Sequence, residues 1–169
     1  MAPLASDEIN RLYLASEQLV GWGLAVLAAW ALLNLTVSGY FVSRADRRYE
    51  SYPFHGMNVG WGMINAGLAC WGVLHLHFTA PAGLRLGDLV QAQLANENVF
   101  LLNAGLDVAY VMTGFFLRAL AGLPAQPKPV RLLGFGRSLW VQGGFLLVFD
   151  VAMWSLLHGH GKSWVPLLG

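Results

Sequence analysis

Four long apolar stretches, separated by short polar segments, dominate the pattern of hydrophobic and polar positions along the chain. They cover about residues 20–42, 56–78, 99–120 and 139–157. A helix that crosses a bilayer needs about 20 mostly apolar residues, and each stretch has about that length. The pattern therefore predicts an all-α fold in which residues 1–169 form one integral membrane domain, a bundle of four transmembrane helices.

Two of these predicted helices extend beyond their apolar stretch on the same side of the membrane. The segment "ASDEINRLYLASEQLV" carries apolar residues at near-helical spacing ahead of the first stretch, and "GDLVQAQLANENVF" does the same ahead of the third. No helix breaker follows either segment, so the first helix is expected from about residue 7 to 45, with Asp7 and Asp88 as candidate N-caps. We therefore expect the first and third helices to project beyond the outer membrane face and to pack on each other.

Glycine and proline mark the breaks between helices and one candidate packing site. "TAPAG" at 79–83 ends the second helix, and "GLPAQPKPV" at 122–130 is a linker with three prolines. Gly56 and Gly60 form a G-x-x-x-G pattern, and Gly62 with Ala66 continues this run of small residues, which lets membrane helices approach closely. The pattern favours packing within the bundle, and a homodimer is the alternative.

The composition agrees with a membrane protein and excludes other classes. The chain is 56% hydrophobic and 11% charged, whereas soluble domains are about 25% charged. The formal net charge of +1 leaves no basic stripe for a nucleic acid. Cys70 is the only cysteine, so the chain has no intrachain disulfide and no cysteine-based metal motif. The lipid bilayer is the partner that the composition predicts.

The distribution of lysine and arginine predicts the orientation. The segments after the first and third stretches must share one side of the membrane. They carry seven basic residues (Arg44, Arg47, Arg48, Arg118, Lys128, Arg131 and Arg137), and the other side carries three (Arg11, Arg85 and Lys162). The positive-inside rule then places the seven in the cytoplasm and both termini outside a bacterial inner membrane. The first 18 residues are too polar for a signal peptide.

Two carboxylates lie inside the predicted spans. Each costs about 2.5–3.5 kcal/mol on the insertion scale. Asp107 and Asp150 lie about 10–12 Å below the outer ends of the third and fourth helices, from a rise of 1.5 Å per residue. Two carboxylates at one depth in a low dielectric should not both be ionised. We expect them to share a proton or to have a donor nearby.

Other polar side chains lie in every span and should face the bundle interior rather than lipid. Depths calculated from the helical rise place Asn34, Asn65 and Gln142 at one level. With the aspartates, the candidate polar network or ligand site comprises Asn34, Asn58, Trp61, Asn65, Asn103, Asp107, Tyr110, Gln142 and Asp150. Two interpretations stay open: a hydrogen-bonded network that fixes the helix order, or a path for a ligand or protons.

The second and fourth spans both end in the pattern Trp-x-x-Leu-His-x-His. It places His75, His77, His158 and His160 at the outer surface. Imidazoles bind zinc, copper, nickel or haem iron, so the four histidines are a candidate metal or haem site. In a continuous helix only one histidine of each pair could face a common site, because residues i and i+2 point about 200° apart. Interfacial histidines beside tryptophan anchors are the alternative.

Three stretches resemble an uncharacterised bacterial family of small four-span membrane proteins. They are "FHGMNVGWGMIN", "LLNAGLDVAYVMTGFFLR" and "GFGRSLWVQGGFLLVFD". The matching positions are Met57, Asn58, Trp61, Asn65, Asn103, Gly105, Leu106, Asp107, Tyr110, Gly134, Gly136, Gln142 and Asp150. The resemblance implies a four-span fold and no known activity. It does not include the four outer histidines.

Three classes of function follow from these features. The first is a non-catalytic accessory subunit, or a module that binds a lipid or cofactor, with other membrane subunits or a second copy as partners. The second is a metal- or haem-dependent membrane enzyme that uses the outer histidines. The third is a conductor of protons or small solutes that uses Asp107 and Asp150. The sequence has no nucleophile–base motif and no phosphate-binding glycine loop, which favours the first class over an enzyme.

Overall fold

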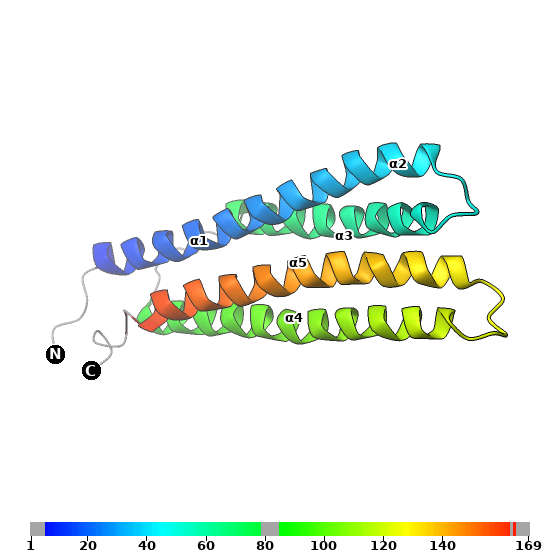
Figure 1. Ribbon diagram of the computed structural model, residues 1–169. Coiled ribbons are helices and arrows are strands. Elements are labelled where there is room, and N and C mark those ends of the chain that lie inside the picture. Colours follow the sequence, from blue (N-terminus) through cyan, green and yellow to red (C-terminus); the bar gives the residue numbers. More distant parts are fainter. Residues whose placement is uncertain (1–5, 79–84, 163, 165–169) are drawn as a thin grey trace.

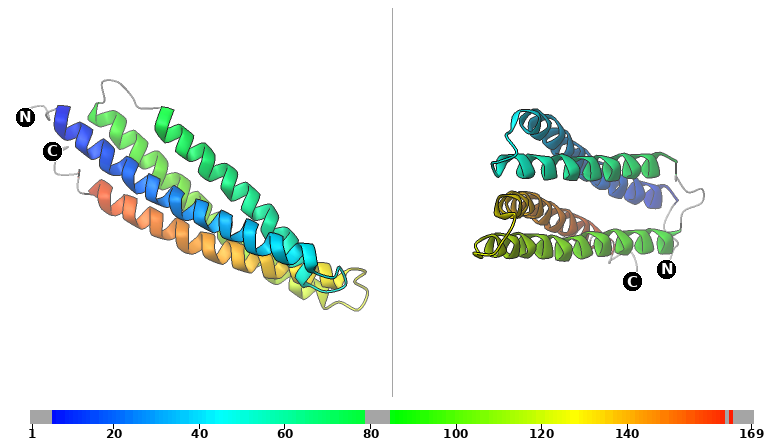
Figure 2. Two further views of the ribbon diagram at one scale, coloured as in Figure 1. Left: turned by 90° about the horizontal axis from the view of Figure 1, so that it is seen from above. Right: turned by 90° about the vertical axis from the view of Figure 1, so that its right-hand side faces the viewer.

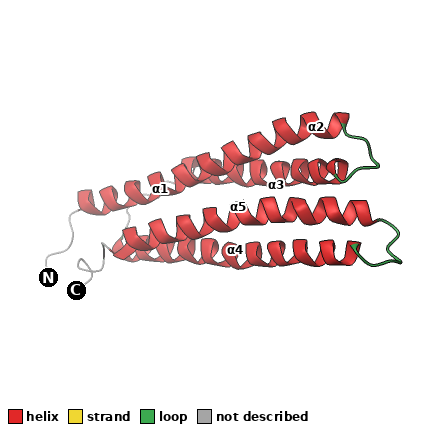
Figure 3. Cartoon of the chain, in the orientation of Figure 1, coloured by secondary structure: helices red, strands yellow, loops and turns green. Residues whose placement is uncertain are grey.

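A computed structural model describes residues 6–78, 85–162 and 164, and the described chain folds into helices (Figures 1 and 3). The elements are α1 (Ser6–Leu33), η1 (Asn34–Ser38), α2 (Gly39–Arg44), α3 (Ser51–Phe78), α4 (Leu86–Ala121) and α5 (Pro129–Lys162). The first three form one continuous helix, and four long helices result. Each is long and apolar enough to cross a membrane, so the predicted all-α fold with four candidate spans is confirmed.

The helices form two antiparallel hairpins that pack on each other (Figure 1). The first hairpin consists of α1, η1 and α2 with α3, and the second consists of α4 and α5. Helix α5 contacts α4, α3 and α1 and buries more residues than any other described helix, so it is the central helix of the bundle. Helix α3 diverges from α5 toward Phe78 (Figure 2, left view).

Glycines allow α4 and α5 to pack backbone to backbone. A Cβ atom on Gly136 would lie 2.7 Å from the carbonyl oxygen of Gly114, and a Cβ atom on Gly114 would lie 2.8 Å from that of Gly136. Any side chain there would push the helices apart. Gly143 is also close to α4, since its Cβ atom would lie 3.1 Å from the carbonyl oxygen of Asp107. These contacts bring the polar side chains of the two helices within reach of each other.

The contact between α1 and α3 differs from the G-x-x-x-G expectation. A Cβ atom on Gly60 would meet nothing within 4 Å, whereas one on Gly62 would lie 3.2 Å from the carbonyl oxygen of Ala31. Gly62, two residues further along, is therefore the close-packing position. Two residues rotate a helix by about 200°, so Gly60 and Gly62 lie on nearly opposite faces.

The predicted extensions of the first and third helices are continuous and touch each other. Ser16 Oγ on α1 donates a hydrogen bond to Gln93 Oε1 on α4 over 3.1 Å. The start of α4 differs in detail from the expectation, because Arg85 and not Asp88 is the N-cap residue. The Asp88 carboxylate accepts a hydrogen bond from the backbone N–H of Arg85 over 3.1 Å, as an acidic residue in the third helical position does in a capping box.

One irregularity interrupts the first long helix. Residues Asn34–Ser38 form a π-helical turn, a feature that occurs frequently at functional sites. Both Asn34 and Ser38 are buried. The Thr36 hydroxyl is exposed and donates to the carbonyl oxygen of Leu32 over 2.7 Å, so it satisfies part of the loosened backbone. The sequence pattern did not predict this turn.

Candidate functional site

Gln142 on α5 is the centre of a buried hydrogen-bonded group, which we call the glutamine cluster (Trp30, Asn34, Asn58, Ser138 and Gln142). Gln142 is fully buried. Its Nε2 donates to Asn34 Oδ1 over 2.7 Å and to Asn58 Oδ1 over 2.9 Å. Its Oε1 accepts from Trp30 Nε1 over 2.9 Å. One amide thereby joins three of the four long helices, with both its donor and its acceptor in use.

The other members of the glutamine cluster are also partnered. Ser138 Oγ donates to Asn58 Oδ1 over 2.6 Å, and Asn34 Nδ2 donates to the carbonyl oxygen of Trp30 over 2.8 Å. Ser138 and Gln142 lie four residues apart and therefore share one face of α5. Asn34, Asn58 and Gln142 were expected in a polar network from the sequence, whereas Ser138 was not. Its position one turn before Gln142 was the signal that could have identified it.

Asp107 on α4 and Asp150 on α5 form a second buried group, the aspartate pair. They are 2% and 4% exposed, and their carboxyl groups interact with each other. Two carboxylates this close in a low dielectric should not both be ionised, as the sequence predicts. Among the described residues, Asp107 Oδ2 has no hydrogen-bond partner. The pair joins the two helices that the glycine contacts hold together.

An apolar level separates the aspartate pair from the glutamine cluster. Gln142, Leu146 and Asp150 follow each other at intervals of four along α5, and Leu146 packs with Leu27 and Ala69 in the hydrophobic core. Eight residues of helix correspond to about 12 Å. Within the described ranges, no hydrogen bond crosses this level between the two polar groups.

Within the described residues, the remaining members of the predicted network form no hydrogen bond to either group. Asn65 is 2% exposed, and its Nδ2 atom has no hydrogen-bond partner within the described residues. Asn103 is half-buried. Tyr110 is half-buried and packs edge-on against Trp61, with 5.0 Å between ring centroids. This aromatic contact connects α3 with α4.

A third polar group lies where α1, α4 and α5 meet, at the end of the bundle away from the short loops. We call it the terminal cluster (Ser16, Gln93, Glu97 and His158). Gln93 is 4% exposed, and its Nε2 donates to Glu97 Oε1 over 3.0 Å and to the carbonyl oxygen of Leu157. Glu97 Oε2 lies 2.9 Å from His158 Nδ1. Gln93 and Glu97 were not predicted from the sequence. Their spacing of four within an amphipathic segment was the available signal.

A model of a family of unknown function, DUF6992, matches residues 26–151. The chain belongs to the DUF6992 family. The match covers the glutamine cluster and the aspartate pair, and it ends before His158. No curated protein and no solved structure matches the chain. The resemblance to a family without known activity is thus confirmed, together with four helices of membrane-spanning length and composition.

The histidines of this DUF6992 protein pair with aromatic rings in the same way on both helices. The Trp71 and His75 rings stack with centroids 5.8 Å apart, and the Trp154 and His158 rings stack at 5.0 Å. The repeated Trp-x-x-Leu-His pattern therefore corresponds to a stacked pair one helical turn apart.

The helical backbone also separates the two histidines of the second pair. Helix α5 continues to Lys162, so His158 and His160 point in different directions. His160 packs against Trp164, with 5.2 Å between ring centroids, and His77 packs against Phe78 at 5.1 Å. The described part of the chain contains no group of three or more histidine, cysteine, aspartate or glutamate side chains that could hold a metal ion.

Proposed function

We propose that this DUF6992 protein is a non-catalytic component of a bacterial inner membrane, either an accessory subunit or a module that binds a lipid or cofactor. The observation that carries this proposal is the state of Gln142. Its amide bonds three side chains on two other helices, so its hydrogen-bonding capacity is used to hold the bundle together. Interhelical hydrogen bonds of this kind fix helix order in membranes.

The outer surface of the helices supports a location in the bilayer. Large apolar side chains such as Trp22, Leu102 and Phe116 are more than 60% exposed. A soluble monomer rarely exposes apolar patches larger than a few hundred Å². Lipid tails would cover this surface, and the seven-to-three bias in basic residues favours the two short loops on the cytoplasmic side.

Copurification tests the proposal directly. Membranes that contain the full chain with an affinity tag are washed with alkaline carbonate, extracted in a mild detergent and analysed by native mass spectrometry. We expect the chain to stay in the washed membranes and to carry a stoichiometric partner subunit, lipid or cofactor. Release by the carbonate wash, or a chain that carries no bound species, would contradict the proposal.

The aspartate pair favours a second candidate function, proton conduction. The two carboxyl groups are buried and in contact, and the free Oδ2 atom of Asp107 could receive a proton from a water chain. In liposomes with a pH-sensitive dye, the intact protein would then carry protons faster than an Asp107→Asn variant. Equal rates in both, or rates no faster than those of empty liposomes, would exclude conduction through the pair.

A further inference from the structure

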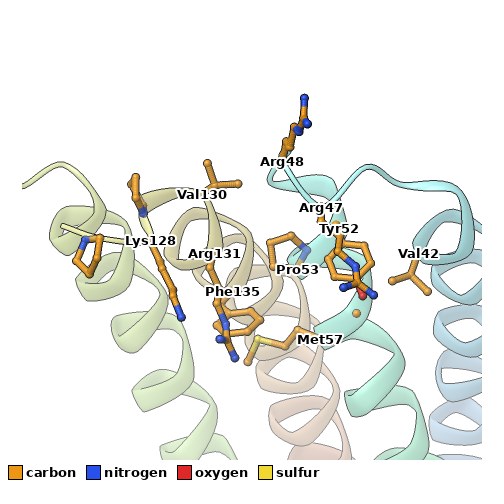
Figure 4. Close-up of a pocket in the computed structure, with 13 residues that line it drawn as sticks. Val42, Arg47, Arg48, Tyr52, Pro53, Met57, Lys128, Val130, Arg131 and Phe135 are labelled. Carbon is orange, nitrogen blue, oxygen red and sulfur yellow. The ribbon is translucent and has the colours of Figure 1, made fainter.

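A cavity of about 560 Å³ opens between the two short loops of the bundle, where the α2–α3 connection faces the α4–α5 connection (Figure 4). We call it the basic cavity. Its size is typical of a small-molecule site, since such sites have about 300–1,000 Å³. Both hairpins contribute to its walls, so an occupant would touch both.

Four cationic side chains line the basic cavity. They are Arg47 and Arg48 from the first loop, Lys128 from the second loop and Arg131 from the first turn of α5. In Figure 4, Lys128 and Arg131 extend side by side along one wall, Arg47 lies beside Tyr52 on the other, and Arg48 extends away from them. None of the described residues that line the cavity is acidic. The electrostatic potential inside it is therefore positive.

The carboxylates near this end do not neutralise the four cations. Glu50 pairs with Arg137, which lies outside the cavity, over 3.3 Å. The Asp46 carboxylate accepts a hydrogen bond from the backbone N–H of Arg48 over 2.9 Å. Within the described ranges, none of the four cavity cations forms an ion pair with a carboxylate. The N-terminus of α5 adds a further partial positive charge beside Lys128.

The walls below the cations are apolar. Pro53 and Met57 come from α3, and Phe135 comes from α5. The Arg131 guanidinium lies 5.1 Å from the centre of the Phe135 ring, at the boundary between the charged and the apolar parts. An occupant that matches both parts has an anionic group and an apolar chain. A free phosphate ion would leave the apolar walls uncovered.

We propose that the basic cavity binds the phosphate headgroup of an anionic phospholipid such as phosphatidylglycerol. The proposal rests on the membrane location in the proposed function and specifies the lipid that the module takes. Arg131, Lys128 and Arg47 contact the phosphate, and one acyl chain lies along Met57 and Phe135. Basic pockets between transmembrane helices on the cytoplasmic side bind anionic headgroups in this way.

The test is a lipid titration of the detergent-purified full chain, followed by native mass spectrometry. We expect one phosphatidylglycerol molecule to bind saturably and more tightly than phosphatidylcholine. The Lys128→Gln/Arg131→Gln variant should bind phosphatidylglycerol about 25-fold more weakly, from about fivefold for each basic residue. The matched control is Arg44→Gln/Arg118→Gln, which removes the same charge at the same end but outside the cavity and leaves the Glu50–Arg137 pair intact. It should change the affinity by less than about twofold.

Three results would overturn the proposal. The first is equal weakening by both double variants, because attraction would then come from the net charge and not from the cavity. The second is equal affinity for phosphatidylcholine. The third is full displacement of the lipid by glycerol phosphate or by an acidic peptide at matched concentration, which would identify a water-soluble anion or a protein segment as the occupant. The carbonate wash distinguishes a failure of the lipid site from a failure of the proposed function. If the chain stays in the washed membranes but shows no lipid preference, only the lipid site is refuted.

Discussion

Replacing Gln142 by leucine tests whether the glutamine cluster holds the bundle together. Leucine has a similar size but no hydrogen-bonding group. The change removes the bonds to Asn34, Asn58 and Trp30. Asn58 Oδ1 keeps its bond from Ser138, whereas Asn34 Oδ1 and Trp30 Nε1 lose theirs. Two polar atoms, one on buried Asn34 and one on half-buried Trp30, are therefore left without these partners.

The expected loss of stability depends on which reference state applies. A buried polar group left unpaired costs about 1–3 kcal/mol in soluble proteins, so two such groups would cost about 2–6 kcal/mol. Interhelical hydrogen bonds in membranes average about 0.6 kcal/mol, and three bonds at that value give about 2 kcal/mol. The unfolded chain in a membrane finds other partners, so we expect the lower figure of about 2 kcal/mol.

The measurement is reversible unfolding in mixed micelles, followed by circular dichroism. Thr113→Val is a matched control, because the exposed Thr113 hydroxyl bonds only to the carbonyl oxygen of Ala109 in its own helix. It should lower the free energy of unfolding by less than about 0.5 kcal/mol. If Gln142→Leu costs no more than this control, the glutamine cluster does not stabilise the helix arrangement, and our reading of its role is wrong.

Three further predictions concern the helix contacts, the aspartate pair and the topology. Gly136→Ala should destabilise the bundle by about 1–3 kcal/mol, because the new Cβ atom would meet the Gly114 carbonyl oxygen at 2.7 Å. Gly60→Ala is the control in the same unfolding assay and should be neutral, because its Cβ atom would meet nothing within 4 Å. Asp107→Leu should cost about 1–3 kcal/mol, because Asp150 loses its buried partner, and Asp107→Asn should cost less, since its amide still donates to Asp150. In a Cys70→Ser background, a membrane-impermeant thiol reagent should label Arg85→Cys from outside intact cells and leave Lys128→Cys unlabelled; the opposite pattern would reverse the orientation.

The number of long helices could be predicted from the sequence because it depends on local properties. Apolar length and the position of proline are sufficient to count them, and "GLPAQPKPV" did mark the break before α5, although α5 begins ten residues before the apolar stretch at 139. Helix α5 nevertheless begins inside that segment, at Pro129. Proline is tolerated at the first helical position because the backbone N–H that it lacks would have no partner within the helix. The π-turn at Asn34–Ser38 was not predictable, since it depends on packing against neighbouring helices.

The partners of the polar side chains could be predicted only in part. The inward positions of Gln142 and Asp150 could be predicted, because the free energy of placing a polar side chain against lipid is unfavourable. The depth calculation placed Gln142 level with Asn34 and Asn65, whereas the structure bonds it to Asn34 and Asn58. Asn58 and Asn65 differ by seven residues, or about 10 Å of helix. A depth counted from the estimated end of a span cannot resolve that difference when helices tilt and their ends are unequal.

A backbone contact near the loops determines which of the two asparagines meets Gln142. A Cβ atom on Gly134 would lie 2.6 Å from the carbonyl oxygen of Glu50 and 2.6 Å from Pro53 Cγ, so the backbone of α5 lies directly against the start of α3 at this glycine. Gln142 lies eight residues after Gly134, and Asn58 lies eight residues after Glu50. The two antiparallel hairpins orient α3 and α5 in the same direction away from this contact, so equal spacing brings Asn58 level with Gln142. Pro53 belongs to this contact and also lines the basic cavity. A ligand held between the two loops would therefore touch the contact that brings Asn58 level with Gln142.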